Sequence, residues 1–256
     1  MSADQLLLTL HGDLPHLLLR QYRPYPEIHY PLSRHASIKD ILEAVGIPHT
    51  EIGGIEKGSR QLDFSYLPQP GEQLDIYPVP AGAAALQPSL LRPDPPTEIR
   101  FLVDINVARL ASLLRMAGFD TVSIGEAEHV PAKREIALQS ARTDRIILSR
   151  DKELLKHREV TFGRLVRNQD PTAQLYEIVS FYGLHSDLLP FRRCLRCNGK
   201  LEPDDKERVM DQLEPLTKKY YYKFRRCGAC SQVYWKGSHH ERMIALLAPI
   251  MADPGS

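Results

Sequence analysis

The chain has few of the features that mark secreted or membrane proteins. Only 4 of its 256 residues are cysteine, and no apolar run approaches the roughly 18 residues that a membrane-spanning helix needs. Residues 1–10 lack the basic start and the small-residue cleavage site of a signal peptide. We therefore expect a cytoplasmic protein that has no membrane partner and is not built on disulfides.

Neither sign of charge dominates the whole chain, but the charges are unevenly distributed. The net charge is +1, and 43% hydrophobic with 25% charged residues is ordinary for a globular protein. Residues 1–96 carry 7 Lys and Arg against 11 Asp and Glu, whereas residues 97–256 carry 26 against 21. The more basic part favours a polyanionic partner. The length is that of about two domains.

The cysteines are the clearest chemical signal. They form two Cys-x-x-Cys pairs with 29 residues between them, Cys194 with Cys197 and Cys227 with Cys230. In a chain without export signals, such pairs indicate thiolate ligands of a metal. Four thiolates make a closed tetrahedral Zn²⁺ site that leaves no position for water, so this zinc is expected to be structural. His239 or His240 could replace a cysteine, but four cysteines suffice.

Two short apolar runs stop at an aspartate. They are Phe101-Leu-Val-Asp104 and Arg145-Ile-Ile-Leu-Ser-Arg-Asp151. Such runs are typical of buried strands in a parallel sheet, whose carboxyl ends meet at one edge. Carboxylates brought together there suit Mg²⁺ or Mn²⁺, which makes Asp104 and Asp151 candidate ligands. Each could instead only cap the helix that follows it, since Asp is a common N-cap.

Residues 1–80 have the element order of a β-grasp, ubiquitin-like domain. Strands are expected at 5–10, 27–30, 51–56, 60–66 and 74–78. A helix is expected at 37–46, with Ser37 as N-cap. The closing strand resembles that of sulfur-carrier domains, which end in an activated Gly-Gly. Here Ala81-Gly-Ala-Ala84 follows and the chain continues, so we expect a docking or regulatory module for a protein partner.

The remaining sequence, after residue 80, is divided into four further segments. Residues 81–97 read as a Pro-rich linker, because proline removes backbone donors and favours an extended spacer. In residues 98–190 strands and helices alternate, which predicts an α/β domain with a parallel sheet and flanking helices. Residues 191–245 are expected to form a zinc ribbon, and residues 246–256 a tail.

Four segments resemble, in order, the PIN-fold ribonuclease family named after the C-terminal domain of the Mut-seven exonuclease, Mut7-C. They are FLVDINVARLASLLRMAGFDT, RIILSRDKELL, PFRRCLRCNGKLEP and CGACSQVYWKGSHHERM. Members of that family often carry an N-terminal ubiquitin-like domain and a C-terminal zinc ribbon. The resemblance implies that Asp104, Asp120 and Asp151 are catalytic acids. It places Arg115 and Gly118 in an LR-x-x-G-x-D signature.

The chain also departs from that family. Where the family usually has Leu-Gly after its first acid and a variable residue, this chain has Asn106-Val-Ala-Arg109. The usual Thr-Arg-Asp is Ser149-Arg-Asp151 here, which keeps the hydroxyl. The acidic start of the family's next helix is replaced by a segment ending in Lys133. A fourth acid would then have to be Glu128 or Glu135.

Three aspartates have structural alternatives. Asp120 begins a strand, so it would lie at the opposite sheet edge unless the preceding loop delivers it, and it could be a turn residue after Gly118. Asp170 precedes Pro171 and fits the N-cap of the last helix. Asp144 fits a turn before its strand.

Cations and aromatic residues alternate around the cysteines. The cations are Arg192, Arg193, Arg196, Lys218, Lys219, Lys223, Arg225, Arg226 and Lys236, and the aromatics are Tyr220, Tyr221, Tyr222, Phe224, Tyr234 and Trp235. Such a mixture suits RNA, because phosphates pair with cations and unstacked bases lie on rings. The alternative is a ribbon with aromatics inside and solvated cations outside. We favour this alternative for individual aromatics and RNA contact for the cations.

The sequence thus predicts a metal-dependent ribonuclease, expected to be an endonuclease, with Mg²⁺ or Mn²⁺ as catalytic cofactor. Its partner would be RNA, with tRNA, rRNA and ribosome-associated RNA as candidates, held between the sheet edge and the ribbon. The alternative is a non-catalytic RNA- or ribosome-binding protein with a degenerate PIN-like domain. A weaker alternative is a nuclease directed at DNA, since carboxylates do not read the sugar.

Overall fold

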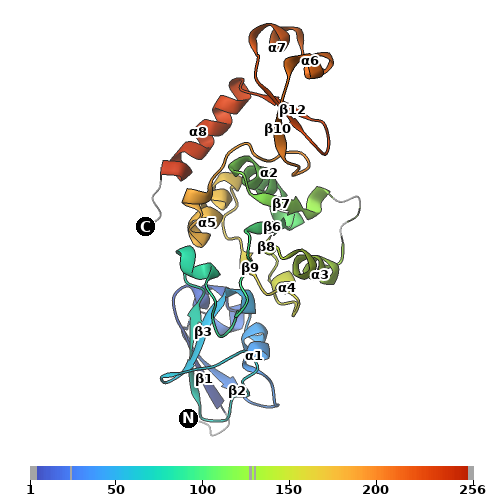
Figure 1. Ribbon diagram of the computed structural model, residues 1–256. Coiled ribbons are helices and arrows are strands. Elements are labelled where there is room, and N and C mark those ends of the chain that lie inside the picture. Colours follow the sequence, from blue (N-terminus) through green and yellow to red (C-terminus); the bar gives the residue numbers. More distant parts are fainter. Residues whose placement is uncertain (1–4, 24, 127–128, 130, 253–256) are drawn as a thin grey trace. The chain divides into compact units, whose positions relative to one another are not determined.

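The computed structural model describes residues 5–23, 25–126, 129 and 131–252 (Figure 1). By compactness the chain divides into two units, residues 1–98 with 131–165 and residues 99–130 with 166–256. No helix in the described ranges combines the length and the apolar character that crossing a bilayer requires.

The first part of unit one is a mixed five-stranded sheet in the order β2-β1-β5-β3-β4. Its strands are β1 Gln5–Leu10, β2 Glu27–Pro31, β3 Ile52–Lys57, β4 Arg60–Gln61 and β5 Gln73–Pro78. β1 is parallel to β5 and antiparallel to β2. Leu6, Leu8 and Leu10 are buried, as the two-residue period of a strand requires. This confirms the predicted ubiquitin-like sheet.

The helix of this sheet, α1 Ile38–Ala44, begins at the predicted cap, because Ser37 Oγ accepts the Asp40 N–H at 3.2 Å. One strand is shorter than expected. β4 ends at Gln61 because Asp63 Oδ1 accepts the Ser65 N–H at 2.8 Å and turns the chain away.

The second sheet has the order β7-β6-β8-β9. Its strands are β6 Arg100–Val103, β7 Asp120–Ser123, β8 Ile146–Ser149 and β9 Gly163–Leu165. β6 pairs in parallel with β7, and β8 pairs in parallel with β9. All four residues of β8 are buried, as an apolar run in a covered parallel sheet predicts. β9 is the shortest of the four, with three residues.

Three helices connect these strands, α2 Ala108–Ala117, α3 Lys133–Thr143 and α4 Lys152–Leu155, and α5 Pro171–Tyr182 follows the last of them. Gly118 ends α2 with φ 108°, and a Cβ there would lie 2.3 Å from the Leu189 carbonyl oxygen. Only glycine fits that position. Asp170 caps α5 by accepting the Ala173 N–H at 2.9 Å, and Asp144 ends α3 at φ 49°. Both structural alternatives are therefore confirmed.

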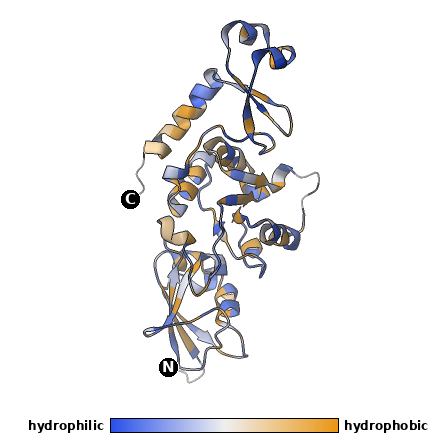
Figure 2. Ribbon diagram, in the orientation of Figure 1, coloured by the Kyte–Doolittle hydropathy of each residue, from blue (hydrophilic) through white to orange (hydrophobic). Residues whose placement is uncertain are grey.

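The ribbon is an antiparallel sheet in the order β10-β11-β12, and it carries short helices on its connection. Its elements are β10 Leu201–Asp204, α6 Lys206–Val209, α7 Pro215–Tyr220, β11 Phe224–Cys227 and β12 Val233–Trp235. A longer helix, α8 Ser238–Ala252, continues past residue 245, where we expected a tail. Its last turns are apolar (Figure 2), and Leu247 and Ile250 are buried.

A buried polar network joins the ubiquitin-like sheet to β9 within unit one. Glu51 is 1% exposed, and its carboxylate binds Arg164 Nη1 at 2.7 Å and the Leu165 N–H at 2.8 Å. His49 Nε2 donates to the Val160 carbonyl oxygen at 2.6 Å. Arg92, from the Pro-rich segment, donates to the carbonyl oxygens of residues 49, 52 and 161. The turn that precedes β3 is thus bonded directly to a strand of the parallel sheet.

We expect Glu51→Gln to lower the free energy of unfolding by about 3 kcal/mol, because Arg164 would keep its buried charge and lose the opposite one. Urea unfolding of the full chain measures this. Glu27→Gln, at an exposed position of β2, is the matched control and should shift the midpoint little. Equal midpoints for the two variants would mean that the network adds no stability.

Candidate functional site

Asp104 follows the carboxyl end of β6 and is held in one orientation. The residue is 5% exposed. Its Oδ1 accepts the Ile105 N–H at 2.7 Å, and its Oδ2 accepts from Asn106 Nδ2 at 2.6 Å. Asn106, which departs from the family pattern, thus takes part in positioning the acid. Carboxylate oxygens can accept hydrogen bonds and also coordinate a hard divalent cation.

Asp151 caps α4 by accepting the Glu153 N–H at 2.9 Å, while its own N–H donates to Ser149 Oγ at 2.8 Å. The hydroxyl expected at position 149 therefore supports the backbone of the acid. Lys133 Nζ lies 2.7 Å from Asp151 Oδ2. Burial by itself raises the pKa of the Asp151 carboxyl, but the hydrogen bonds from Lys133 and from backbone N–H groups outweigh it, so the pKa lies below its usual range. The group is a carboxylate at neutral pH.

The candidates for a fourth acid remain unassigned. Glu128 lies outside the described residues. Glu135 caps the start of α3, where its Oε2 accepts the Ala132 N–H at 3.2 Å. Lys133, which stands in the segment where the family usually has an acid, instead brings a positive charge to Asp151.

Asp120 lies at the opposite end of its strand pair. In the parallel register it faces Arg100, at the amino end of β6, whereas Asp104 follows the carboxyl end. At about 3.3 Å per residue, the two acids are roughly 13 Å apart along the strands. The Asp120 carboxylate accepts from Asn198 Nδ2 at 2.8 Å and lies 3.2 Å from Arg193 Nη2. The structure thus brings Asp120 to the loop of the first cysteine pair.

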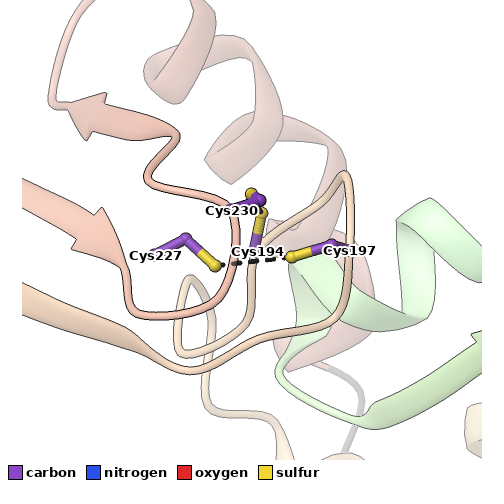
Figure 3. Close-up of side chains that lie close together, drawn as sticks. All are labelled: Cys194, Cys197, Cys227 and Cys230. Atoms are coloured by element: carbon purple, nitrogen blue, oxygen red, sulfur yellow. Dashed lines mark hydrogen bonds between the residues drawn. The ribbon is translucent and has the colours of Figure 1, made fainter.

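The four cysteines converge, and their sulfur atoms lie within 4.8 Å of one another (Figure 3). Cys194 and Cys230 are 3.6 Å apart, and Cys197 and Cys227 are 3.4 Å apart. Tetrahedral Zn–S bonds of about 2.3 Å would put the sulfur atoms about 3.8 Å apart, so the spacing fits zinc. The histidines considered as substitutes are not in this cluster, and His240 stacks on Phe191 at 4.3 Å.

Both cysteine pairs form the same turn. The N–H of Asn198 donates to the Cys194 carbonyl oxygen, and the N–H of Ser231 donates to the Cys227 carbonyl oxygen. Asn198 and Ser231 have positive φ values of 67° and 60°. The repeated geometry points all four sulfur atoms inward, as a zinc ribbon requires.

Tyr234 supports the first cysteine from the ribbon strand β12. Its hydroxyl oxygen accepts the Leu195 N–H at 3.1 Å, which leaves its hydrogen to donate to Cys194 Sγ at 3.1 Å. Burial raises the pKa of the Cys194 thiol, but hydrogen bonds from Tyr234 and nearby backbone N–H groups lower it to about 7. Cys194 is therefore prepared to serve as a thiolate ligand.

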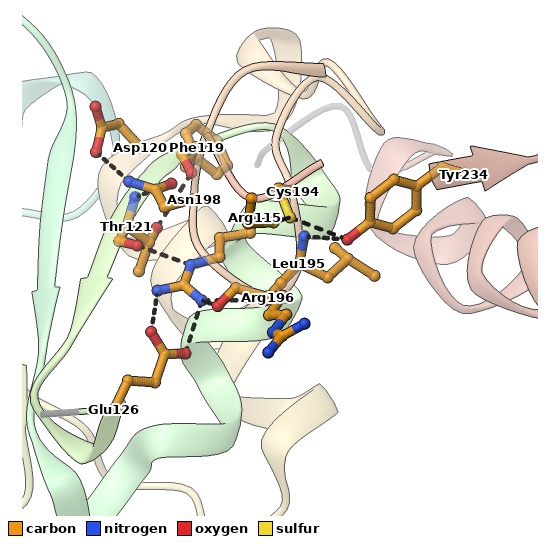
Figure 4. Close-up of polar contacts among 11 residues, drawn as sticks. Arg115, Phe119, Asp120, Thr121, Glu126, Cys194, Leu195, Arg196, Asn198 and Tyr234 are labelled. Carbon is orange, nitrogen blue, oxygen red and sulfur yellow. Dashed lines mark hydrogen bonds and ion pairs between the residues drawn. The ribbon is translucent and has the colours of Figure 1, made fainter. Parts of the chain in front are cut away.

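Arg115 fixes the first cysteine loop to α2 and β7 (Figure 4). The side chain is 1% exposed. Its Nε donates to the Thr121 carbonyl oxygen at 2.8 Å, and its Nη1 donates to the carbonyl oxygens of Leu195 and Arg196 at 3.0 and 3.2 Å. Both terminal nitrogens bind the Glu126 carboxylate at 2.7 Å. One guanidinium thus connects three segments of the chain.

The residues of the LR-x-x-G-x-D signature hold the loop of the first cysteine pair against α2 and β7. Arg115 binds the loop, Gly118 admits the Leu189 backbone, and Asp120 binds Asn198. Asn198 Oδ1 also accepts the Thr121 N–H at 3.0 Å. Sequence reasoning missed Asn198, although its place directly after the second cysteine of a pair was visible.

We expect Arg115→Met to destabilise the chain by about 3 kcal/mol, because three carbonyl oxygens and the Glu126 carboxylate would lose a donor. Arg115→Lys should recover only part of this, since an ammonium cannot match the planar fork. Urea unfolding measures the loss, and Arg109→Met on the same helix is the control. If the Arg115 and Arg109 variants unfold at the same urea concentration, the junction does not stabilise the chain.

Two family models match the chain. Residues 4–83 match the Mut7-C ubiquitin model, and residues 99–247 match the Mut7-C RNAse domain. The second match covers more than half of the chain and includes both the parallel sheet and all four cysteines. The chain belongs to the Mut7-C RNAse family. Searches of curated proteins and of solved structures returned no match.

Membership of the Mut7-C RNAse family implies a ribonuclease, with RNA as its substrate. The resemblance inferred from the four sequence segments is confirmed. The Mut7-C RNAse match runs into α8, so the ribbon is part of the family domain. Its four-cysteine cluster is consistent with a structural zinc.

Proposed function

We propose that this Mut7-C RNAse is a metal-dependent endoribonuclease that hydrolyses phosphodiester bonds with Mg²⁺ or Mn²⁺ held by Asp104 and Asp151. The observation that carries the proposal is that each of these aspartates follows the carboxyl end of a parallel strand, and that these strands, β6 and β8, are neighbours in the sheet order. Ligands bind at that edge of open α/β sheets.

The donor set fits a hard divalent cation. Both residues are carboxylates whose oxygens also accept N–H hydrogen bonds, so their orientation is fixed before a metal arrives. Oxygen ligands of this kind suit Mg²⁺ and Mn²⁺. Asp120, by contrast, is bonded to Asn198 and Arg193, and we assign it to docking of the cysteine loop, although the family resemblance counts it among the acids.

The residues around the two aspartates have different roles in the proposed reaction. When bound, the cation would supply an activated water and neutralise charge on the phosphate. Asn106 and the Ile105 N–H hold the Asp104 carboxylate, and Ser149 supports the turn of Asp151. Lys133 is half exposed at its side chain, so it can leave Asp151 when a cation binds and pair with an RNA phosphate.

RNA would also be held by the ribbon. Arg193 is ion-paired with Asp120, and Arg226 is ion-paired with Asp204. We therefore do not count these two arginines among the cations that bind RNA phosphates. Among the ribbon cations, several exposed side chains have no acidic partner in the part of the chain that the structure describes, and they include Arg192, Arg196, Lys223 and Lys236. These are the cations that we propose to bind phosphates.

The test is cleavage of labelled single-stranded and structured RNAs by the zinc-loaded protein, with and without added Mg²⁺ or Mn²⁺. We expect internal cleavage that requires the added cation and RNA binding that does not. Cleavage of DNA at the same rate would favour the broader nuclease that the sequence left open.

One observation favours the second candidate, a non-catalytic RNA- or ribosome-binding protein. The Lys133–Asp151 ion pair stands in the segment where the family usually has an acid, and an ammonium can compete with a metal for that carboxylate. Salt-sensitive RNA binding without cleavage under any cation would overturn the nuclease and support this candidate.

A further inference from the structure

A cavity of about 710 Å³ opens between the ribbon strands, the segment before the first cysteine pair and α8. Small-ligand pockets span roughly 300–1,000 Å³, so the volume suits a ligand. Its wall carries the rings of Phe191, Tyr222, Trp235 and His240. None of the four is fully buried, which leaves ring surface for a ligand.

The backbone of Phe191 is held in an unusual conformation at this wall. Its φ is 59°, in the left-handed region that bulky side chains rarely adopt. Its N–H donates to the Met116 carbonyl oxygen at 3.1 Å, and its own carbonyl oxygen accepts from Arg225 Nη1 at 3.0 Å. The ring stacks on His240 at 4.3 Å. Backbone strain fixed from two sides is typical of ligand sites.

The charge of the cavity favours an anion. Lys223 and Lys236 line it, are exposed, and have no acidic partner among the described residues. Asp204, which also lines it, is ion-paired with Arg226 at 2.7 Å. Burial, with a smaller effect of Lys236, lowers the pKa of His240, so its ring is neutral and suited to stacking at pH 7.

We infer that this cavity binds one unstacked base of single-stranded RNA, with Lys223 and Lys236 at the flanking phosphates. Aromatic faces combined with cations are how proteins hold single strands. Duplex RNA is not expected to enter, because its bases are stacked inside the helix. The inference rests on RNA being the substrate, as proposed above, but it does not require cleavage.

Trp235 is the only tryptophan of the chain, so its fluorescence reports on this cavity. The full-length zinc-loaded protein, without Mg²⁺ or Mn²⁺, is titrated with a five-nucleotide single-stranded RNA. The control ligand is an abasic ribose-phosphate chain of the same length and charge. We expect the RNA to quench Trp235 and to bind about tenfold more tightly than the abasic chain, because only the RNA can stack.

Matched variants separate the cavity from its surroundings. Tyr222→Ala should weaken RNA binding several-fold, whereas Tyr220→Ala, an exposed tyrosine outside the lining, should not. Lys236→Ala should lower the salt dependence of binding by about 0.7 in the logarithmic slope, the share of one phosphate contact. Lys219→Ala, also outside the lining, should leave the slope unchanged. Zinc content checks that each variant is folded.

Equal affinity for RNA and the abasic chain would overturn the inference. So would RNA binding, seen by anisotropy of a labelled strand, that leaves Trp235 unchanged, although the ribonuclease proposal would stand. A blue shift of Trp235 with phosphatidylglycerol vesicles but no response to RNA would assign the cavity to an apolar partner and overturn it too. Quenching by RNA, with no cleavage after Mg²⁺ or Mn²⁺ is added to the same complex, would support the cavity and contradict the ribonuclease.

Discussion

Cys194→Ser is expected to lose the bound zinc and to unfold the ribbon. Structural zinc in small domains of this kind contributes on the order of 10 kcal/mol or more, and the ribbon has only small apolar clusters to hold it without metal. The loss should extend to α2 and β7, because Arg115 and Asn198 bond the first cysteine loop to them. We therefore expect one zinc per chain in the wild type and close to none in the variant.

Zinc content by elemental analysis and thermal unfolding followed by Trp235 fluorescence measure this effect. Ala229→Ser, an exposed position inside the second cysteine pair, is the control that leaves all four ligands. His239→Ala and His240→Ala should keep the zinc, since neither histidine lies in the cysteine cluster. Full zinc content in Cys194→Ser, or its loss in a histidine variant, would contradict the four-cysteine site.

The sequence predicted the features that depend on neighbouring residues. Ser37 and Asp170 cap their helices, and Gly118 ends α2, because capping involves groups within a few positions along the chain. The cysteine cluster and the apolar runs that end before Asp104 and Asp151 were visible for the same reason. The fold class followed from the alternation of these elements.

The contacts that could not be predicted from the sequence join residues that lie far apart along the chain. Glu51 binds Arg164, 113 positions away, and Asp120 binds Asn198, 78 positions away. Such partners depend on tertiary packing, which no local pattern encodes. Our proposal that Asp120 holds the loop of the first cysteine pair rests on one of these contacts.

Asp104→Asn and Asp151→Asn are each expected to slow metal-dependent cleavage by about 1,000-fold or more, which corresponds to about 4 kcal/mol of activation free energy. Asparagine is as good an N-cap as aspartate, so the local backbone should stay intact. The substitution removes only the negative charge. If the two aspartates did nothing but cap their helices, both variants would keep their activity.

Asp170→Asn is the matched control, because Asp170 also caps a helix after a strand of the same sheet. Its rate should stay within a few-fold of the wild type. Asp120→Asn tests the remaining acid. We expect it to weaken zinc retention or stability through its contacts with Asn198 and Arg193 and to leave the chemical step in place. Lost cleavage with unchanged zinc and fold would return Asp120 to the catalytic acids.

The most direct measurement of the central claim is the single-turnover cleavage rate of one labelled RNA at saturating Mn²⁺, for wild type, Asp104→Asn, Asp151→Asn and Asp170→Asn. RNA affinity and zinc content are measured on the same preparations. If Asp104 and Asp151 hold the catalytic cation, only the Asp104→Asn and Asp151→Asn variants lose cleavage, while all four proteins bind RNA and zinc alike. Cleavage that survives both of those substitutions, or that Asp170→Asn abolishes equally, would contradict it.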